Sequence, residues 1–264
     1  MAWGTIVVSA IFSLIGLFVF IYGFNRLRKY GLIQDIPRSK IRSLAMGLVE
    51  IHGQVKAKDF LLSPFSQSKC VYYRYEIQEY RRHTHVDSKG HTHTSYSWDT
   101  IAGGEKRIPF WAKDETGEVY VEPQRAEFNL SLKKLYLQKA GSFGSLTSFL
   151  KSLKMQKKLN PSALKLVPLD PKKKIFFNGR VGDRRFYEYF LEPEENLFVM
   201  GTAARQGQKV LIKQGKNEPT FIISNRSEKD LLRSLKWQMI ASFIFGGFFF
   251  LTGIFIILTQ LQVL

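Results

Sequence analysis

Hydrophobic residues are distributed unevenly along this chain, because both ends contain long apolar stretches without a charged side chain. The stretch 4–24 is rich in Ile, Val, Leu and Phe, and the stretch 237–264 has no Asp, Glu, Lys, Arg or His. A helix rises about 1.5 Å per residue, so roughly 20 apolar residues cross a hydrocarbon core of about 30 Å. The pattern predicts two transmembrane helices. A capping box at 227–230 predicts that the second lies in a helical segment 227–264.

A cleaved signal peptide is the alternative interpretation of the first stretch. Signal peptides carry their basic residues before the apolar run, whereas Arg26, Arg28 and Lys29 follow it here. The run is also longer than the apolar region of a typical signal peptide. We therefore expect an integral membrane protein anchored at both ends.

Between the apolar ends, many short runs alternate apolar and polar residues with a period near two, which is typical of β-strands. The runs predicted as strands are 46–58, 70–82, 95–102, 107–113, 118–122, 185–191, 197–203, 209–213 and 220–223. Turn-forming sequences connect several of them. The expected fold class is α+β, with a β-rich antiparallel barrel or sandwich-like domain, residues 31–225, inserted between two transmembrane helices.

The segment 131–174 breaks the strand pattern. It holds eleven lysines against one acidic residue, Asp170, and its apolar residues recur at helical spacing between positions 143 and 153. We expect a basic amphipathic helix that either lies along an anionic leaflet or packs its apolar stripe on the β domain. The lysines assigned to lipid or partner binding are Lys151, Lys154, Lys158, Lys172, Lys173 and Lys174.

Charge favours a negatively charged neighbour. The 264 residues include 39 Lys and Arg against 22 Asp and Glu, a net charge of +17, and all of these lie between Arg26 and Lys236. Anionic lipid headgroups, an unidentified protein partner or nucleic acid would suit this balance, with nucleic acid the least expected. Basic residues flank the inner end of both apolar stretches, so the positive-inside rule places the central domain in the cytoplasm and both termini outside.

Four of the five histidines lie in one short interval, at His83, His85, His91 and His93. In a hairpin with a three- or five-residue loop, His85 would pair with His91 and His83 with His93, which gathers four imidazoles on one face. Such a group would suit zinc or another transition metal. A four-residue loop would separate the pairs, and the alternative is a solvated or pH-responsive hairpin tip.

Catalytic signals are sparse. The single Cys70 has no neighbouring base in the sequence, so we expect a buried small residue and not a catalytic thiol. The acids Glu188, Glu192, Glu194 and Glu195 could supply paired carboxylates, but no second signal supports hydrolysis. There is no phosphate-binding loop, no dinucleotide glycine fingerprint and no His-Glu-x-x-His motif. We assign no catalytic residue and expect no resident cofactor beyond a metal at the histidines.

Five segments in order resemble the GIDE domain family, which includes mitochondrial outer-membrane ubiquitin ligases of the MULAN type. They read IPRSKIRSLAMGLVEIHG (36–53), LSPFSQSKCVYYRYE (62–76), GEKRIPF (104–110), DETGEVYVEP (114–123) and FYEYFLEPEENLFVMGTA (186–203). The resemblance implies a β-rich domain beside a membrane that binds substrates or partners. The mitochondrial members place this domain in the intermembrane space, which differs from the cytoplasmic placement given by charge. A microbial plasma membrane would remove the conflict.

Ligase activity does not follow from this resemblance. In the ligases, a C-terminal RING finger recruits the ubiquitin-charged enzyme, and a RING holds zinc through several thiolates. The single cysteine of this sequence cannot build one. We therefore expect a membrane protein that presents a basic interaction domain, and the alternative is a ligase component that needs a RING or other catalytic partner in trans.

Overall fold

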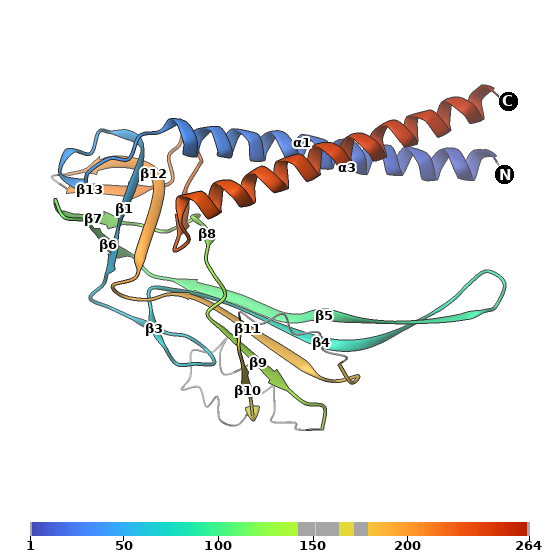
Figure 1. Ribbon diagram of the computed structural model, residues 1–264, viewed down its shortest axis with the longest axis horizontal. Coiled ribbons are helices and arrows are strands. Elements are labelled where there is room, and N and C mark those ends of the chain that lie inside the picture. Colours follow the sequence, from blue (N-terminus) through green and yellow to red (C-terminus); the bar gives the residue numbers. More distant parts are fainter. Residues whose placement is uncertain (1, 142–150, 152–163, 172–178, 208, 263–264) are drawn as a thin grey trace.

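Two long helices lie side by side at one end of a β-rich body in the computed structural model, which describes residues 2–141, 151, 164–171, 179–207 and 209–262 (Figure 1). Helix α1 spans Ala2–Asp35 and helix α3 spans Glu228–Gln262. A short 3-10 helix, η1, covers Ile41–Ser43. The two chain termini lie together at the far end of the helical pair.

Five strands close into a small barrel. They are β1 (Gly47–Lys56), β6 (Phe110–Lys113), β7 (Glu118–Val121), β13 (Lys209–Lys213) and β12 (Asn196–Gln206), paired in this order. Strand β12 also pairs with β1, which completes the ring. Strands β14 (Ile222–Ser224) and β8 (Glu127–Asn129) extend the sheet from β12. Apolar side chains such as those of Ile51, Val121 and Ile212 are fully buried in the core.

A second sheet has the order β10 (Val167–Leu169), β9 (Lys134–Gln138), β11 (Arg184–Leu191), β4 (Tyr72–Val86) and β5 (Thr92–Arg107). Strands β2 (Leu61–Leu62) and β3 (Lys69–Cys70) form a separate small pair. The β4–β5 hairpin projects well beyond the sheet and runs in the same direction as the helical pair (Figure 1). The register of this hairpin shifts once, between Ile77 and Gln78.

The bases of both helices pack on the outer face of the barrel. Ile33 of α1 and Leu231 and Leu235 of α3 are buried against Phe198 and Met200 of β12. Helix α1 ends at Asp35, two residues before Pro37, because proline disfavours helical backbone in the preceding residue and cannot donate a helical hydrogen bond. The domain is thus fastened to both helices by apolar contacts.

The predicted cap at Ser227 is confirmed at the start of α3, although the Asp230 side chain bonds the Ser227 hydroxyl and not its backbone N–H. The Asp230 N–H donates to Ser227 Oγ at 3.2 Å, and Ser227 Oγ–H donates to Asp230 Oδ2 at 2.6 Å. Ser227 satisfies a backbone donor that the first turn of a helix leaves unpaired. The helix then continues without interruption to Gln262.

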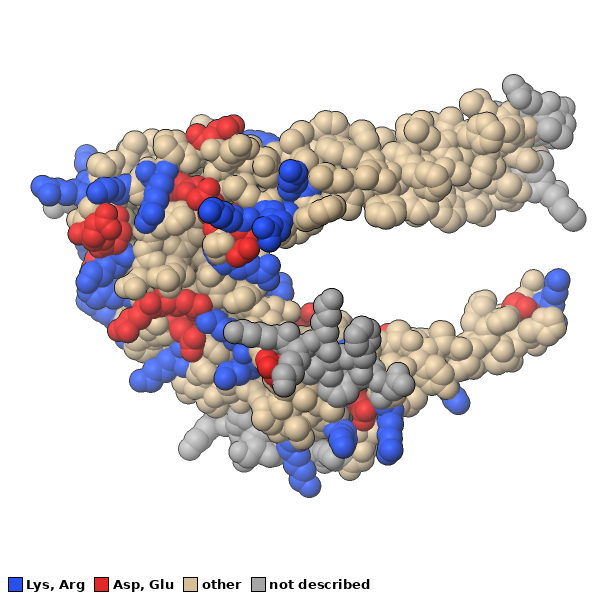
Figure 2. Space-filling view, in the orientation of Figure 1, with Lys and Arg blue, Asp and Glu red and all other residues tan. Residues whose placement is uncertain are grey.

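Beyond their bases, both helices are long and apolar enough to cross a membrane. They face outward with large apolar side chains: Phe18 of α1 is 73% exposed and Leu251 of α3 is 66% exposed. A core helix of a soluble domain would bury such residues. Figure 2 shows no charged side chain on the outer part of the pair, and Lys and Arg gather at its base and over the β body.

The predicted α+β class with a β barrel between two apolar helices is confirmed, with two local corrections. The barrel sheet is not wholly antiparallel, because β13 pairs parallel with β7 and β14 parallel with β8. The segment 131–174, expected to be a helical insert, contains strands β9 and β10 near its ends. The apolar stripe predicted between positions 143 and 153 lies outside the described residues.

Candidate anion site at the helix base

Basic side chains gather where the uncharged part of α1 ends. Arg26, Arg28 and Lys29 occupy the turn that follows Phe24, and they line a cavity of about 360 Å³ together with Arg125 and Glu127. We call this cavity the collar pocket. Its remaining wall comes from Tyr22 and Asn25 of α1 and from Gln214, Pro219, Thr220 and Phe221 of the loop before β14.

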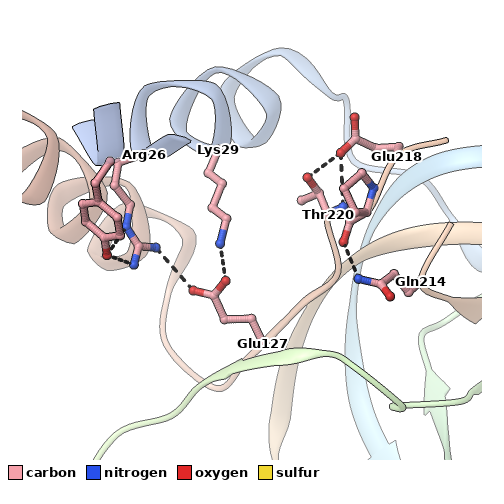
Figure 3. Close-up of polar contacts among 8 residues, drawn as sticks. Arg26, Lys29, Glu127, Gln214, Glu218 and Thr220 are labelled. Atoms are coloured by element: carbon pink, nitrogen blue, oxygen red, sulfur yellow. Dashed lines mark hydrogen bonds and ion pairs between the residues drawn. The ribbon is translucent and has the colours of Figure 1, made fainter. Parts of the chain in front are cut away.

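Glu127, the first residue of β8, joins the barrel sheet to α1. Its carboxylate accepts hydrogen bonds from Lys29 Nζ and, at 3.4 Å, from Arg26 Nη1 (Figure 3). Burial alone would raise the pKa of Glu127, but the two cations outweigh it and hold that pKa below its usual value. The carboxylate therefore stays ionised and fixes both cationic side chains.

A second acid fixes the opposite wall of the collar pocket. Glu218 Oε2 accepts from Arg28 Nη2 at 2.7 Å, and Glu218 Oε1 accepts from Thr220 Oγ1 at 2.6 Å. The hydrogen bonds from Thr220, followed by the Arg28 guanidinium, hold the pKa of Glu218 below its usual value. Gln214 Nε2 donates to the Pro219 carbonyl at 2.9 Å, so the loop itself is braced (Figure 3).

The collar pocket keeps a positive excess after these pairs are counted. Four cationic side chains line the pocket, and Glu127 is its single lining acid. Glu218 pairs with one of the cations, Arg28, so two positive charges stay without a compensating acid. Arg125 is exposed and forms no ion pair with the described residues. Guanidinium groups bind phosphate and carboxylate oxygens through paired N–H donors. The arrangement therefore suits an anion such as a phosphate.

Aromatic side chains lie near both ends of the apolar part of the helical pair. Tyr22 accepts a hydrogen bond from Arg26 Nε at 2.7 Å, and the Arg26 guanidinium lies 4.6 Å from the centre of its ring. Trp237, 67% exposed, follows the last basic residue of α3, and Trp3, 76% exposed, stands near the opposite end of α1. Trp3 and Tyr22 are separated by roughly 28 Å of helix, close to the thickness of a hydrocarbon core. Trp and Tyr favour both edges of that core.

Only one of the six lysines predicted to bind lipid or a partner lies among the described residues. Lys151 is exposed, and Lys154, Lys158, Lys172, Lys173 and Lys174 lie outside the described residues. Arg26, Arg28 and Lys29 were predicted from the sequence to orient the chain in the membrane and not to form a binding site. Their position directly after an apolar run was the available signal, whereas Arg125 and Glu127 join them only through the fold.

Three of the hairpin histidines, His83, His85 and His93, lie on strands whose register differs from the one expected, and His91 lies in the loop between the strands. His85 pairs with His93 and His83 with Ser95, around the five-residue loop 87–91. His83 Nε2 lies 2.9 Å from Asp99 Oδ2, and the rings of His91 and His93 approach Asp87 Oδ2 at 3.2 and 3.4 Å. Among the described residues, the hairpin does not bring three ligand atoms within 4.8 Å of one another. The predicted pairing partners are wrong, and metal binding at the hairpin stays a prediction.

The other chemically reactive candidates are held in structural contacts. Cys70 is fully buried, and burial together with the nearby Glu188 and Glu192 carboxylates raises the pKa of its thiol to about 12. Glu188, also buried, accepts the backbone N–H of Phe65 at 2.7 Å. Glu192 and Glu195 both bind Lys133 Nζ, at 3.2 and 2.7 Å. These contacts agree with the structural interpretation of the cysteine and of the acids.

The fold defines a class of protein: a β-rich domain held between two helices that are each apolar enough to cross a membrane. The family follows from the sequence match. The model of the family described as "GIDE: E3 Ubiquitin ligase" matches residues 79–258, about two thirds of the chain, and the chain belongs to this family. No curated protein and no solved structure matches the chain.

The matched range confirms the suspected GIDE resemblance and extends it. It includes the segments 104–110, 114–123 and 186–203 and continues to residue 258 within α3. The segments 36–53 and 62–76 precede it. The family description concerns ubiquitin ligases, and the single cysteine of these 264 residues cannot hold the zinc of a RING.

Proposed function

We propose that this protein is a two-span membrane protein whose GIDE domain binds anionic lipid headgroups through the collar pocket. The observation that carries the proposal is the position of the cations. Arg26, Arg28 and Lys29 follow an uncharged stretch long enough to cross the hydrocarbon core, so in a bilayer they would meet phosphate groups. The lysines Lys151, Lys154, Lys158 and Lys172 to Lys174 are proposed as further contacts to lipid or to a protein partner.

Orientation forms part of the proposal. Basic residues accompany the domain side of both helices, and the positive-inside rule then puts the domain in the cytoplasm with both termini outside. The basic side chains would both select orientation and bind the leaflet that carries more anionic lipid.

Lipid selectivity tests the proposal directly. The detergent-solubilised full chain is melted in neutral micelles and in micelles doped with phosphatidylglycerol. A ligand that binds only the folded state raises the unfolding midpoint by mass action. We expect phosphatidylglycerol to raise the midpoint of the wild type, and Arg125→Gln to reduce this rise.

Arg205→Gln is the matched control, because Arg205 is also exposed but lies at the end of β12, outside the collar pocket. It should respond to phosphatidylglycerol like the wild type. Equal responses of wild type, Arg125→Gln and Arg205→Gln would show that binding is not at the collar pocket. Charge reversal at Lys151, Lys154 and Lys158 tests the lysine contacts in the same assay.

The family description supports a second candidate function, a ligase component that acts with a catalytic partner in trans. Two observations favour it: the match to a family described as E3 ubiquitin ligases, and the single cysteine of these 264 residues, which cannot hold the zinc of a RING. Affinity purification in mild detergent should then recover a RING-containing protein in stoichiometric amount. Ubiquitin transfer by the purified chain alone would contradict this division of labour.

A further inference from the structure

An acid and a histidine of β1 meet an acid of α3 on the barrel face that carries the helices. Glu50 and His52 are two residues apart on β1, so their side chains point to the same face. Glu228 is the first residue of α3, next to the cap Ser227. The surrounding contacts are those of the apolar helix base, including Phe198. Two carboxylates and an imidazole thus meet beside a mostly apolar interface.

The three side chains lie within ligand distance of a single ion. His52 Nε2 is 3.0 Å from Glu50 Oε1 and 3.9 Å from Glu228 Oε2, and one donor atom of each residue lies within 4.8 Å of the others. Two ligands on a tetrahedral zinc ion are about 3.3 Å apart. The first distance is close to this value, and the Glu228 carboxylate, whose side chain is 41% exposed, would have to approach His52 by about 0.6 Å and to turn toward Glu50.

Glu50 supplies the observation that points to a ligand. The residue is 2% exposed, and its Oε2 has no hydrogen-bond partner among the described residues. Leaving a buried carboxylate oxygen unpaired costs about 1–3 kcal/mol or more, so such an atom calls for an ion or a water. Arg38 and Arg226 line the adjoining cavity of about 660 Å³, but neither forms an ion pair with Glu50 or Glu228 in the described part of the chain.

Access and orientation also suit an ion. His52 and Glu228 both line the cavity, and their side chains are 26% and 41% exposed, so solvent reaches the cluster. The His52 ring packs edge-on against Phe198 with centroids 5.4 Å apart, which holds the imidazole in place. One imidazole with two carboxylates is a ligand set for Zn²⁺ and similar divalent transition metals, whereas Ca²⁺ and Mg²⁺ prefer oxygen alone.

We propose that Glu50, His52 and Glu228 form a binding site for a divalent transition metal ion, with Zn²⁺ as the best-fitting probe. Three protein ligands leave one position open for water or for a group from a partner. On binding, the proton shared between Nε2 of His52 and Glu50 is released to solvent through the cavity, and the ion takes its place between them. The ion would join the first turn of α3 to β1, and so fasten the second apolar helix to the barrel.

Zinc titration of the full chain tests this site against the histidine hairpin. Detergent-solubilised protein is stripped with a chelator, dialysed and titrated with ZnCl₂ by calorimetry, with metal content measured afterwards. The wild type and His93→Ala should bind zinc equally at this site. Glu50→Gln, His52→Ala and Glu228→Gln should each lower the affinity at least about tenfold.

Thermal unfolding keeps the test informative if a variant is suspected of misfolding. Without metal, Glu50→Gln should melt close to the wild-type midpoint or above it, because it removes the charge of a buried carboxylate whose Oε2 has no partner among the described residues. Zinc should raise the midpoints of the wild type and of His93→Ala, and not those of the three site variants. Glu228→Gln changes a partly exposed residue and serves as the second variant. The proposal is overturned if the wild type binds no zinc, or if the three variants bind it as the wild type does. Loss of binding in His93→Ala alone would assign the metal to the hairpin instead.

Discussion

At the scale of single residues, the contacts of three glutamates explain their different roles in the fold. Glu188 is fully buried yet accepts backbone N–H groups from Phe65 and Ser66, so it organises the loop after β2. Glu127 ties β8 to α1 through two cations. Glu50 differs, because one of its oxygens has no partner among the described residues. A polar group left in that state is where a ligand is expected.

The Glu127 contact should make the attachment of α1 dependent on pH. The folded-state pKa of Glu127 is lowered below the reference value of 4.5, so its stabilising contribution is complete above that value and is lost as pH falls through the lower folded-state pKa. Because the side chain is 47% exposed, solvent screening limits the contribution to about 1 kcal/mol, or about 2–4 °C in the unfolding midpoint.

Thermal unfolding of Glu127→Gln measures this contribution. The variant should melt below the wild type at pH 7 and converge with it as the pH falls through the lowered pKa of Glu127. Glu115→Gln is the matched control, since Glu115 is 72% exposed and forms a single long pair with Lys40 at 3.4 Å. If Glu127→Gln and the wild type differ by the same amount at every pH, the ionised carboxylate is not the stabilising group.

Cys70 should be unreactive in the folded protein. A thiol with a pKa of about 12 carries almost no thiolate at pH 8, and the residue has no exposed surface. Iodoacetamide followed by mass spectrometry should leave the folded chain unmodified and should alkylate it once after denaturation. Rapid stoichiometric alkylation of the folded chain would mean that the sheet around Cys70 opens.

At the scale of elements, small residues set the approach of the two helices. A Cβ atom added to Gly246 would lie 2.6 Å from the backbone N of Phe20, and one added to Gly16 would lie 2.5 Å from the backbone N of Phe250. No side chain fits in either place, because the obstacle is backbone. Close packing at small residues is how helices associate where the surrounding solvent is itself apolar.

Two adjacent glycines give a matched pair of substitutions. Gly246→Ala should force the helices apart and lower stability by about 1–3 kcal/mol. Gly247→Ala would place its Cβ 3.9 Å from the Phe20 ring, an ordinary contact, and should be neutral or stabilising because alanine favours helix. Unfolding of both variants in detergent measures the difference. Equal effects would show that the helices do not pack as the structure has them.

The strands with clear alternation could be predicted from sequence, whereas several short ones, among them β8 and β9, could not. The runs 46–58 and 197–203 gave β1 and β12 nearly at their bounds, since each has one face in the barrel core. Strand β8 has three residues and no visible period, and β9 lies in the lysine-rich segment 131–174, where apolar residues at helical spacing favoured a helix. Such short strands are fixed by their partners in the sheet and not by their own sequence.

At the scale of the whole molecule, the long hairpin lies beside the helical pair across an open gap (Figure 2). Its outer part is exposed and polar, with Arg81, Arg82 and Lys89 near the tip. A charged side chain in the centre of a bilayer costs about 3 kcal/mol on insertion scales. With the helices in a membrane, we therefore expect the hairpin to swing into water, with the register shift at Ile77 and Gln78 as the bend.

Cysteine labelling in sealed vesicles locates the hairpin tip. Lys89→Cys should react rapidly with a membrane-impermeant maleimide applied from the domain side, and buried Cys70 adds no background. Ser13→Cys, placed on the buried face of α1 between the helices, is the protected control. Protection of Lys89→Cys to the same degree would place the tip inside the bilayer and contradict the expected swing.

Contacts between segments that are distant in the sequence could not be predicted from it. Nothing local predicts that β12 returns to β1, that Arg125 and Glu127 face α1, or that Glu228 meets Glu50. The charge-free ends and the alternating middle were sufficient for the α+β class, because burial against a core leaves a local pattern. The collar pocket, whose walls come from three distant segments, leaves no such local pattern.

Extraction of the full chain from membranes tests the central claim most directly. Membranes from cells that express the protein are washed with alkaline carbonate, which releases peripheral proteins, and the pellet is then treated with detergent. If α1 and α3 both cross the bilayer, the chain should remain in the carbonate pellet and appear in solution only with detergent. Recovery of the folded chain in the carbonate supernatant would contradict the account.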